Sequence, residues 1–169
     1  ARNNLGVALA HLGEVDRGIE ELRAAARIAR EGSDVDDVAR AVVNLSAVLF
    51  DAGRFPESLA VALGGIATVE QLGLQRRKGI WCRCDAVDSL LVLGRSDEAE
   101  DLLREAFALH PEGIDAVRAH GMRGALALRR GRLDEARSEL LRARRLGRHV
   151  VDGHLILPVV RALQETLRW

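Results

Sequence analysis

The side chains best suited to bind a metal ion are few and scattered in this chain. No histidine pairs with another histidine or a cysteine at the i, i+4 spacing that places two ligands on one helix face, so we expect no metal site and place the histidines on the surface or in a groove. Cys82 and Cys84 lie two residues apart and would point to different faces of a helix, which favours two reduced thiols packed in a core. Reduced thiols are typical of a cytoplasmic protein. The histidines are His11, His110, His120, His149 and His154.

The carboxylates and hydroxyls lack the surroundings that catalysis needs. Adjacent acids such as Asp36 and Asp37 fall at a helix start, where carboxylates are solvated. No serine lies in a strand–turn–helix elbow, and the serines instead take cap or small packing positions. We therefore expect no enzymatic activity and no cofactor. The serines are Ser33, Ser46, Ser58, Ser89, Ser96 and Ser138.

The charge of the chain does not indicate its partner. Lys plus Arg and Asp plus Glu number 25 each, so no net charge attracts nucleic acid or anionic lipid. Residues 129–148 are locally rich in arginine, which makes nucleic-acid binding a lesser alternative and an acidic partner another. These arginines spread around the helices, and no aromatic residues alternate with them for base stacking. No apolar run approaches the roughly 20 residues that span a bilayer, so we also expect no membrane contact.

The elements that must position these side chains are predicted to be helices. Ala, Leu, Arg and Glu dominate, Tyr is absent, and β-branched residues never alternate with polar ones, so we expect no strands. Short connectors favour antiparallel packing of consecutive helices. The predicted helices span residues 2–12, 16–31, 35–52, 56–72, 75–93, 97–110, 112–130, 134–147 and 150–168.

A turn motif recurs about every 40 residues and divides the chain into repeats. Each copy has a glycine that can end one helix in the left-handed conformation, then a polar cap or proline with acidic residues that begins the next helix. A small residue follows each glycine at a fixed distance, and three copies have a leucine one helical turn later. Small residues let two helix backbones approach, and leucines fill the groove between them. The glycines are Gly13, Gly53, Gly94 and Gly131, the small residues are Gly18, Ser58, Ala99 and Ala136, and the leucines are Leu22, Leu103 and Leu140.

This pattern resembles the tetratricopeptide repeat over essentially the whole chain. The family has large, small and large residues on its first helix, a glycine at the turn, and small, large and small residues on its second helix. The first repeat matches with Leu5, Gly6, Leu9, Gly13, Gly18, Leu22 and Ala25. The resemblance implies an all-α fold, a right-handed α-solenoid of antiparallel helix pairs with about four and a half repeats. It also implies a single domain over residues 1–169 that binds a protein, peptide or small effector and catalyses nothing.

The repeat departs from the usual family pattern in one informative way. Its spacing is nearer about 40 residues than the usual 34, and its Arg-rich and Ala-rich texture is similar to the sensor region of large bacterial signal-transduction ATPases of the LuxR and MalT type. In those transcription regulators a nucleotide-binding module precedes the repeats and a DNA-binding helix-turn-helix follows them. No Walker-type glycine loop occurs here, so we expect a fragment of such a regulator. A free-standing adaptor or a peptide-pheromone receptor is the alternative.

The resemblance further implies a binding groove along the first helix of each pair. Trp81 and Phe50 are interpreted as apolar anchors, and Arg40, Arg118 and Arg161 as binders of a carboxylate or phosphate. The alternative is that Trp81 packs between helices and the arginines are solvated. The Lys and Asn set of the chaperone-type carboxylate clamp is not matched, so we do not expect chaperone tails as ligands. The predicted groove residues are Asn3, His11, Arg40, Phe50, Asp51, Trp81, Asp88, Arg118, Arg129 and Arg161.

The last segment, from His149 to Trp169, is predicted to be the first helix of a fifth pair whose partner is missing. Such a helix leaves an apolar strip partly exposed, unless the chain self-associates or Pro158 bends the helix back. We therefore expect self-association through this helix as one outcome. The strip contains Leu155, Ile156, Val159 and Trp169.

Overall fold

The computed structural model describes residues 1–32, 34–149 and Ala162, and this part of the chain contains helices and no strands. Two short turns of other helix types flank the last repeats: the π-helical η1 (Gln75–Gly79) leads into α5, and the 3-10 turn η2 (Gly147–His149) follows α8. The α-helices are α1 (Arg2–His11), α2 (Val15–Glu31), α3 (Val35–Asp51), α4 (Phe55–Gln71), α5 (Ile80–Val92), α6 (Ser96–Ala108), α7 (Gly113–Arg129) and α8 (Leu133–Leu146).

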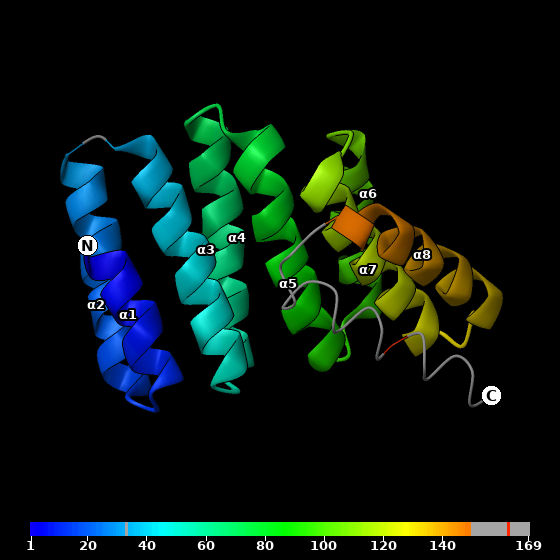
Figure 1. The fold of residues 1–169 in the computed structure, drawn as a ribbon, viewed down its shortest axis with the longest axis horizontal. Coiled ribbons are helices and arrows are strands. Elements are labelled where there is room, and N and C mark those ends of the chain that lie inside the picture. The colour runs from blue at the N-terminus through cyan, green and yellow to red at the C-terminus, as the bar shows by residue number, and fades with distance from the viewer. Residues whose placement is uncertain (33, 150–161, 163–169) are drawn as a thin grey trace.

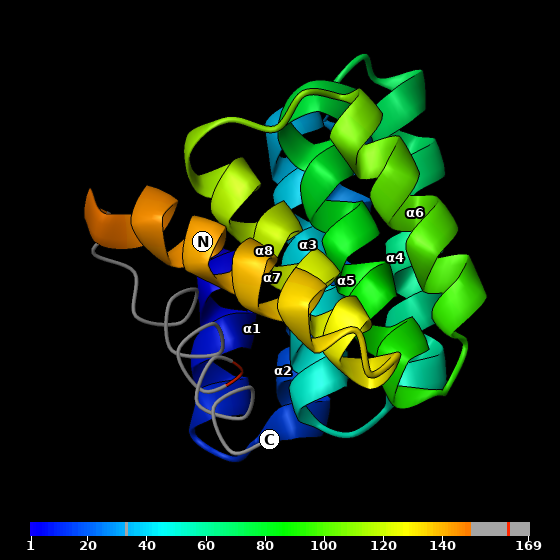
Figure 2. The ribbon, with the colours of Figure 1, turned by 90° about the vertical axis from the view of Figure 1, so that its right-hand side faces the viewer.

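The helices form an all-α repeat solenoid, as predicted. Consecutive helices pack against each other as antiparallel hairpins, and the pairs follow one another along the longest axis of the molecule (Figure 1). The first helices of successive pairs also touch, α1 with α3, α3 with α5 and α5 with α7. In the turned view, α4 and α6 lie together on one side of the array and α1 lies on the other (Figure 2). We call the surface formed by α1, α3, α5 and α7 the first-helix face.

The predicted helix bounds are confirmed for the first eight helices with one difference. Most ends agree to within a residue or two, but the fifth helix begins with the π-helical η1 before α5 starts at Ile80. The predicted helix 150–168, its apolar strip and Arg161 lie outside the described residues.

The repeated turns adopt the predicted conformation. The glycines Gly13 and Gly94 have φ angles of +89° and +75°, in the left-handed region where a side chain is strained. The helix after each turn then begins with favourable first-turn residues, such as Pro56 in α4 and Asp97 in α6. The turn chemistry therefore sets where each helix pair folds back on itself.

Close approach of the paired helices depends on the small residues that the repeat supplies. A Cβ atom added to Gly6 would lie 2.7 Å from Leu22 Cγ and 2.8 Å from the Gly18 carbonyl oxygen. In the last pair, a Cβ atom on Gly124 would lie 2.6 Å from Leu140 Cγ. The predicted leucines Leu22 and Leu140 thus pack against glycines of the first helices, and these contacts hold α1 against α2 and α7 against α8.

Polar residues in the core are paired or uncharged. Ser46, Ser58 and Ser89 form a buried hydrogen-bonded series that links α3, α4 and α5, so the serines act in packing as predicted. Cys82 and Cys84 are both buried free thiols, and burial raises the pKa of each to about 12. Both cysteines therefore pack as neutral groups, also as predicted.

Candidate partner-binding site

Five charged or aromatic side chains meet where α5 and α7 lie side by side on the first-helix face. Trp81, Asp85 and Asp88 lie at positions i, i+4 and i+7 of α5, which places them on one side of that helix. Asp115 and Arg118, at i and i+3, extend toward them from α7. We call these five residues the α5–α7 polar cluster.

Arg118 is the centre of this cluster. Its Nη2 atom donates a hydrogen bond to Asp85 and lies 3.4 Å from Asp88 Oδ2. Its guanidinium carbon lies 4.8 Å from the centre of the Trp81 ring, within the range of a cation–π interaction. The Trp81 indole N–H donates a hydrogen bond to Asp115 Oδ1 at 2.6 Å, so Trp81 is held by both Asp115 and Arg118.

Burial controls the charges of the cluster. Asp85 is only 5% exposed, and burial raises its pKa to about 7 although the nearby Arg118 lowers it. Burial also raises the pKa of Asp88, against Arg118, and the charge of Asp51 at the end of α3 raises it further. Burial lowers the pKa of Arg118, but Asp85 and Asp88 outweigh that effect and the net shift is upward. Arg118 is therefore a permanent cation between two carboxylates that titrate well above their usual range.

The hydrogen bonds of the cluster are incomplete. Among the described residues, the buried atoms Asp85 Oδ2 and Arg118 Nε have no hydrogen-bond partner. A buried polar atom without a partner costs about 1–3 kcal/mol, and native proteins contain few of them. Trp81 and Asp88 beside these atoms are only half-buried. The cluster thus combines an unsatisfied interior with an opening at the surface.

The polar cluster brings together three of the predicted groove residues, Trp81, Asp88 and Arg118. A fourth, Asp51, lies near enough for its charge to act on Asp88. Their predicted role in ligand binding stays a prediction. A carboxylate or phosphate that binds Arg118 would have to compete with Asp85, because Asp85 already accepts a hydrogen bond from the guanidinium.

Asn3, His11, Arg40, Phe50 and Arg129, the other predicted groove residues that the structure describes, make their contacts outside the cluster. Asn3 is buried and accepts a hydrogen bond of 3.3 Å from Asn44 Nδ2, which joins α1 to α3. Phe50 packs edge-on against Phe55, with ring centres 5.2 Å apart. Arg40 is exposed and pairs with an aspartate one turn earlier on its own helix. His11 and Arg129 are exposed.

Sequence reasoning missed Asp85, the most deeply buried acid of the cluster. Its partner Arg118 is 33 positions away on another helix, so no local spacing reveals the pair. A usable signal was the acid four residues after Trp81 in a largely apolar helix, one turn before a second acid, Asp88. Asp115 was missed for the same reason, because its contact with Trp81 also joins two repeats.

Arg83 holds the start of α5 in position. It is 5% exposed, and its guanidinium donates to Glu70 Oε1 at 2.6 Å, to Glu105 Oε2 at 3.1 Å and to the Gly79 carbonyl oxygen at 3.3 Å. These contacts tie α4, the π-helical η1 and α6 to the helix turn that carries Trp81. Arg83 therefore positions the cluster without belonging to it.

The prediction that the histidines lie on the surface or in a groove is wrong for His120. This side chain is buried between α6, α7 and α8, with its Nδ1 2.5 Å from Glu139 Oε2 and its ring edge-on to Phe107. The guanidinium carbon of Arg123 lies 3.8 Å from the centre of the Phe107 ring, and Arg123 Nη2 donates a hydrogen bond to Glu139 Oε1. Burial lowers the pKa of His120, although Glu139 raises it. The group is a joint between the third and fourth repeats.

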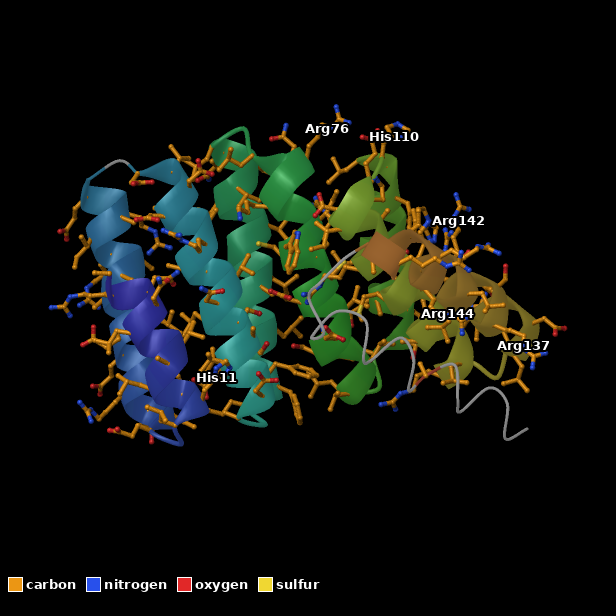
Figure 3. All side chains as sticks on the ribbon, in the orientation of Figure 1. His11, Arg76, His110, Arg137, Arg142 and Arg144 are labelled. Carbon is orange, nitrogen blue, oxygen red and sulfur yellow. The ribbon has the colours of Figure 1, made fainter. Side chains whose placement is uncertain are left out.

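Other charged side chains point outward. Figure 3 shows that His11 and His110 lie far apart, and no group of three or more His, Cys, Asp or Glu side chains suited to a metal ion occurs in the described part of the chain. Arg137, Arg142 and Arg144 are exposed along α8, and within residues 1–32 and 34–149 they form no ion pair. No described helix has the length and hydropathy needed to cross a bilayer.

Comparison with known proteins identifies the repeat. Family models described as tetratricopeptide repeat match residues 84–149 and residues 39–63, together more than half of the chain, and the longer match covers α7 and the part of α5 that follows Arg83. No curated protein matches. Among solved structures, a thermophilic TPR protein of Thermus thermophilus is 21% identical, with 97% of this chain and 100% of that chain covered and a TM-score of 0.47. On the strength of the two model matches, the chain belongs to the tetratricopeptide repeat family.

Proposed function

We propose that this chain binds an extended segment of a partner protein across its first-helix face, with the α5–α7 polar cluster at the centre of the contact. Tetratricopeptide repeats form helical scaffolds for protein interaction. Within that scaffold, the incomplete polar network beside Trp81 is the single observation that carries the proposal.

A network that served only to join α5 and α7 would gain most from complete pairing. Here one buried carboxylate oxygen of Asp85 and the buried Nε of Arg118 stay without partners among the described residues. A ligand that supplies these hydrogen bonds removes a cost that the free protein carries. Trp81 adds a rigid, half-buried aromatic surface of the kind that anchors interfaces.

The proposed activity is binding without catalysis. A nucleophilic cysteine needs a lowered pKa, whereas burial raises the pKa of Cys82 and Cys84 to about 12. Both thiols are therefore protonated at neutral pH, and neither is exposed.

The cellular role that we favour is the sensor region of a cytoplasmic bacterial signal-transduction or transcription regulator. Its support is the long repeat spacing and the Arg-rich and Ala-rich texture of the sequence. A free-standing adaptor or a peptide-pheromone receptor is the alternative. The two differ in the complete gene, where a sensor region lies between a nucleotide-binding module and a helix-turn-helix. Nucleic-acid binding is a lesser alternative, supported by exposed Arg137, Arg142 and Arg144.

The test begins with peptides selected from a random phage-displayed library against the whole chain. Binding of the selected peptides is then measured by fluorescence anisotropy for Trp81→Ala, for Arg118→Ala and for a control, Arg104→Ala, on the exposed side of α6. We expect Trp81→Ala and Arg118→Ala each to weaken binding at least about tenfold, the range of interface hot spots, and Arg104→Ala to leave it unchanged. Circular dichroism checks that each variant is folded under the binding conditions, which matters most for Arg118→Ala because that change removes one side of a buried ion pair. Trp81→Ala tests the surface without breaking that pair. Peptides that depend on Arg104, or that ignore both cluster variants, would refute the proposed surface.

A further inference from the structure

The α5–α7 polar cluster carries more negative than positive charge. Its single cation is Arg118. The carboxylates of Asp85 and Asp88 raise the pKa of Arg118, and the charge of Asp51, at the end of α3, raises the pKa of Asp88. The carboxylates therefore outnumber the guanidinium even when Asp115, which accepts the Trp81 N–H, is left out of the count.

Arg118 is not free to meet an acidic ligand. Its Nη2 atom faces Asp85 and Asp88, and its guanidinium carbon lies over the Trp81 ring. An incoming carboxylate would have to displace an aspartate whose side chain is 4% exposed, and it would face the remaining acids at short range. Like charges brought together at an interface cost several kcal/mol. The cluster thus disfavours anions.

Two buried atoms of the cluster are unpaired within the described chain: Asp85 Oδ2 lacks a hydrogen-bond donor, and Arg118 Nε lacks an acceptor. Asp85 is more than nine-tenths buried, and its Oδ2 atom has no donor within the described chain. Asp88 beside it has a side chain that keeps 31% of its surface exposed, so this acid is reachable from solvent. Charge-assisted hydrogen bonds from an ammonium or guanidinium to a carboxylate are among the strongest that a side chain can supply.

We propose that the α5–α7 polar cluster binds a cationic side chain, lysine or arginine, of the partner segment. The proposal rests on the proposed function and names the chemistry of its ligand. Asp88 accepts hydrogen bonds from the cation, the negative charges of Asp85 and Asp51 add attraction, and Arg118 fixes Asp85, Asp88 and the Trp81 ring in place. The role of Arg118 is thereby positioning, since it does not contact the cation.

The test uses Trp81 as its own reporter. A Trp169→Phe background leaves Trp81 as the only tryptophan of the chain, and acetylated, amidated tetralysine and tetraglutamate serve as probes. We expect tetralysine to change the Trp81 fluorescence saturably and tetraglutamate to leave it unchanged. Asp88→Asn should weaken tetralysine binding about tenfold. Asp101→Asn, which removes the same charge from an exposed site on α6, should not change it.

Three outcomes would overturn the inference. They are a saturable response to tetraglutamate, no saturable response to tetralysine, and equal weakening by Asp88→Asn and Asp101→Asn, which would mean unspecific attraction. The library peptides separate this failure from failure of the proposed function. Peptides that lose binding on Trp81→Ala but carry no basic residue, and are insensitive to Asp88→Asn, would leave the binding surface in place and refute only its preference for cations.

Discussion

Arg118 of α7 donates a hydrogen bond to Asp85 of α5, and so joins the third and fourth repeats through an ion pair that is largely shielded from solvent. Two consequences follow from that pair. It fixes the relative position of two first helices, and it presents Trp81 and Asp88 at the surface between them. The predictions below address each consequence and the packing on which both depend.

Removal of Arg118 should destabilise the fold because it leaves Asp85 as a buried acid without a counter-charge. Breaking one side of a buried pair costs about 3–5 kcal/mol, and the ability of Asp85 to take up a proton places the expected loss near the lower end. Urea unfolding followed by circular dichroism measures it. The double variant Arg118→Met with Asp85→Leu should recover much of the lost free energy of unfolding, since neither charge then remains. A double variant less stable than Arg118→Ala would contradict the assignment of the cost to the unpaired acid.

Stability should depend on pH in a direction that Asp85 sets. Its pKa rises from the ordinary value of 3.8 to about 7 in the folded protein, through burial. Between these values the folded state binds more protons than the unfolded state, so this group lowers the free energy of unfolding as the pH rises toward 7. Arg118 and Asp88 face it, and Asp88 shifts in the same direction. His120, whose pKa burial lowers, contributes the opposite slope.

This prediction is tested by the difference in free energy of unfolding between the wild type and Asp85→Asn. Both values are determined across the same pH range. Acids paired with arginine, such as Glu57, have lowered pKa values and lose their contribution only as the pH falls below about 4.5, at the acid end of this window and away from pH 7. The wild-type value should decline relative to that of Asp85→Asn as the pH approaches 7. Parallel curves would show that Asp85 does not titrate in this range.

Two glycines inside helices should respond to alanine in opposite ways. A Cβ atom on Gly6 meets Leu22 and the backbone of Gly18, so Gly6→Ala should cost about 1–3 kcal/mol through overpacking. A Cβ atom on Gly64, within α4, meets nothing within 4 Å, and Gly64→Ala should stabilise the fold by about 0.5–1 kcal/mol through helix propensity. Thermal unfolding of the two variants compares them directly. Equal effects would mean that α1 and α2 do not pack as described.

The parts of the fold that the sequence predicts well are those with local causes. Turn glycines such as Gly13 and the small residues after them act within one helix pair, and their spacing is visible in one repeat. The register along each first helix also placed Trp81, Asp88 and Arg118 on the same face. Local patterns therefore suffice for helix order, for the turns and for candidate surface positions.

Contacts between repeats are not accessible to that reasoning. Arg118, the partner of Asp85, and Phe107, which packs against His120, lie on neighbouring repeats, so both contacts depend on how far one hairpin is displaced against the next. A histidine with a neighbour such as Glu139 can be buried without a metal ion, which the sequence alone does not reveal. The charge balance of the α5–α7 polar cluster likewise emerges only when α5 and α7 are assembled, and the influence of Asp51 only when α3 is added.

The central claim is that a partner segment contacts the first-helix face at the α5–α7 polar cluster. The most direct measurement is backbone amide NMR of the whole chain, titrated with a library-selected peptide and mapped onto the helices. The account predicts that shifts concentrate on α3, α5 and α7 around Asp51, Asp88 and Arg118, and that the Trp81 indole N–H signal moves with them. Shifts that concentrate instead on α2, α4 and α6, with the indole signal unchanged, would contradict it.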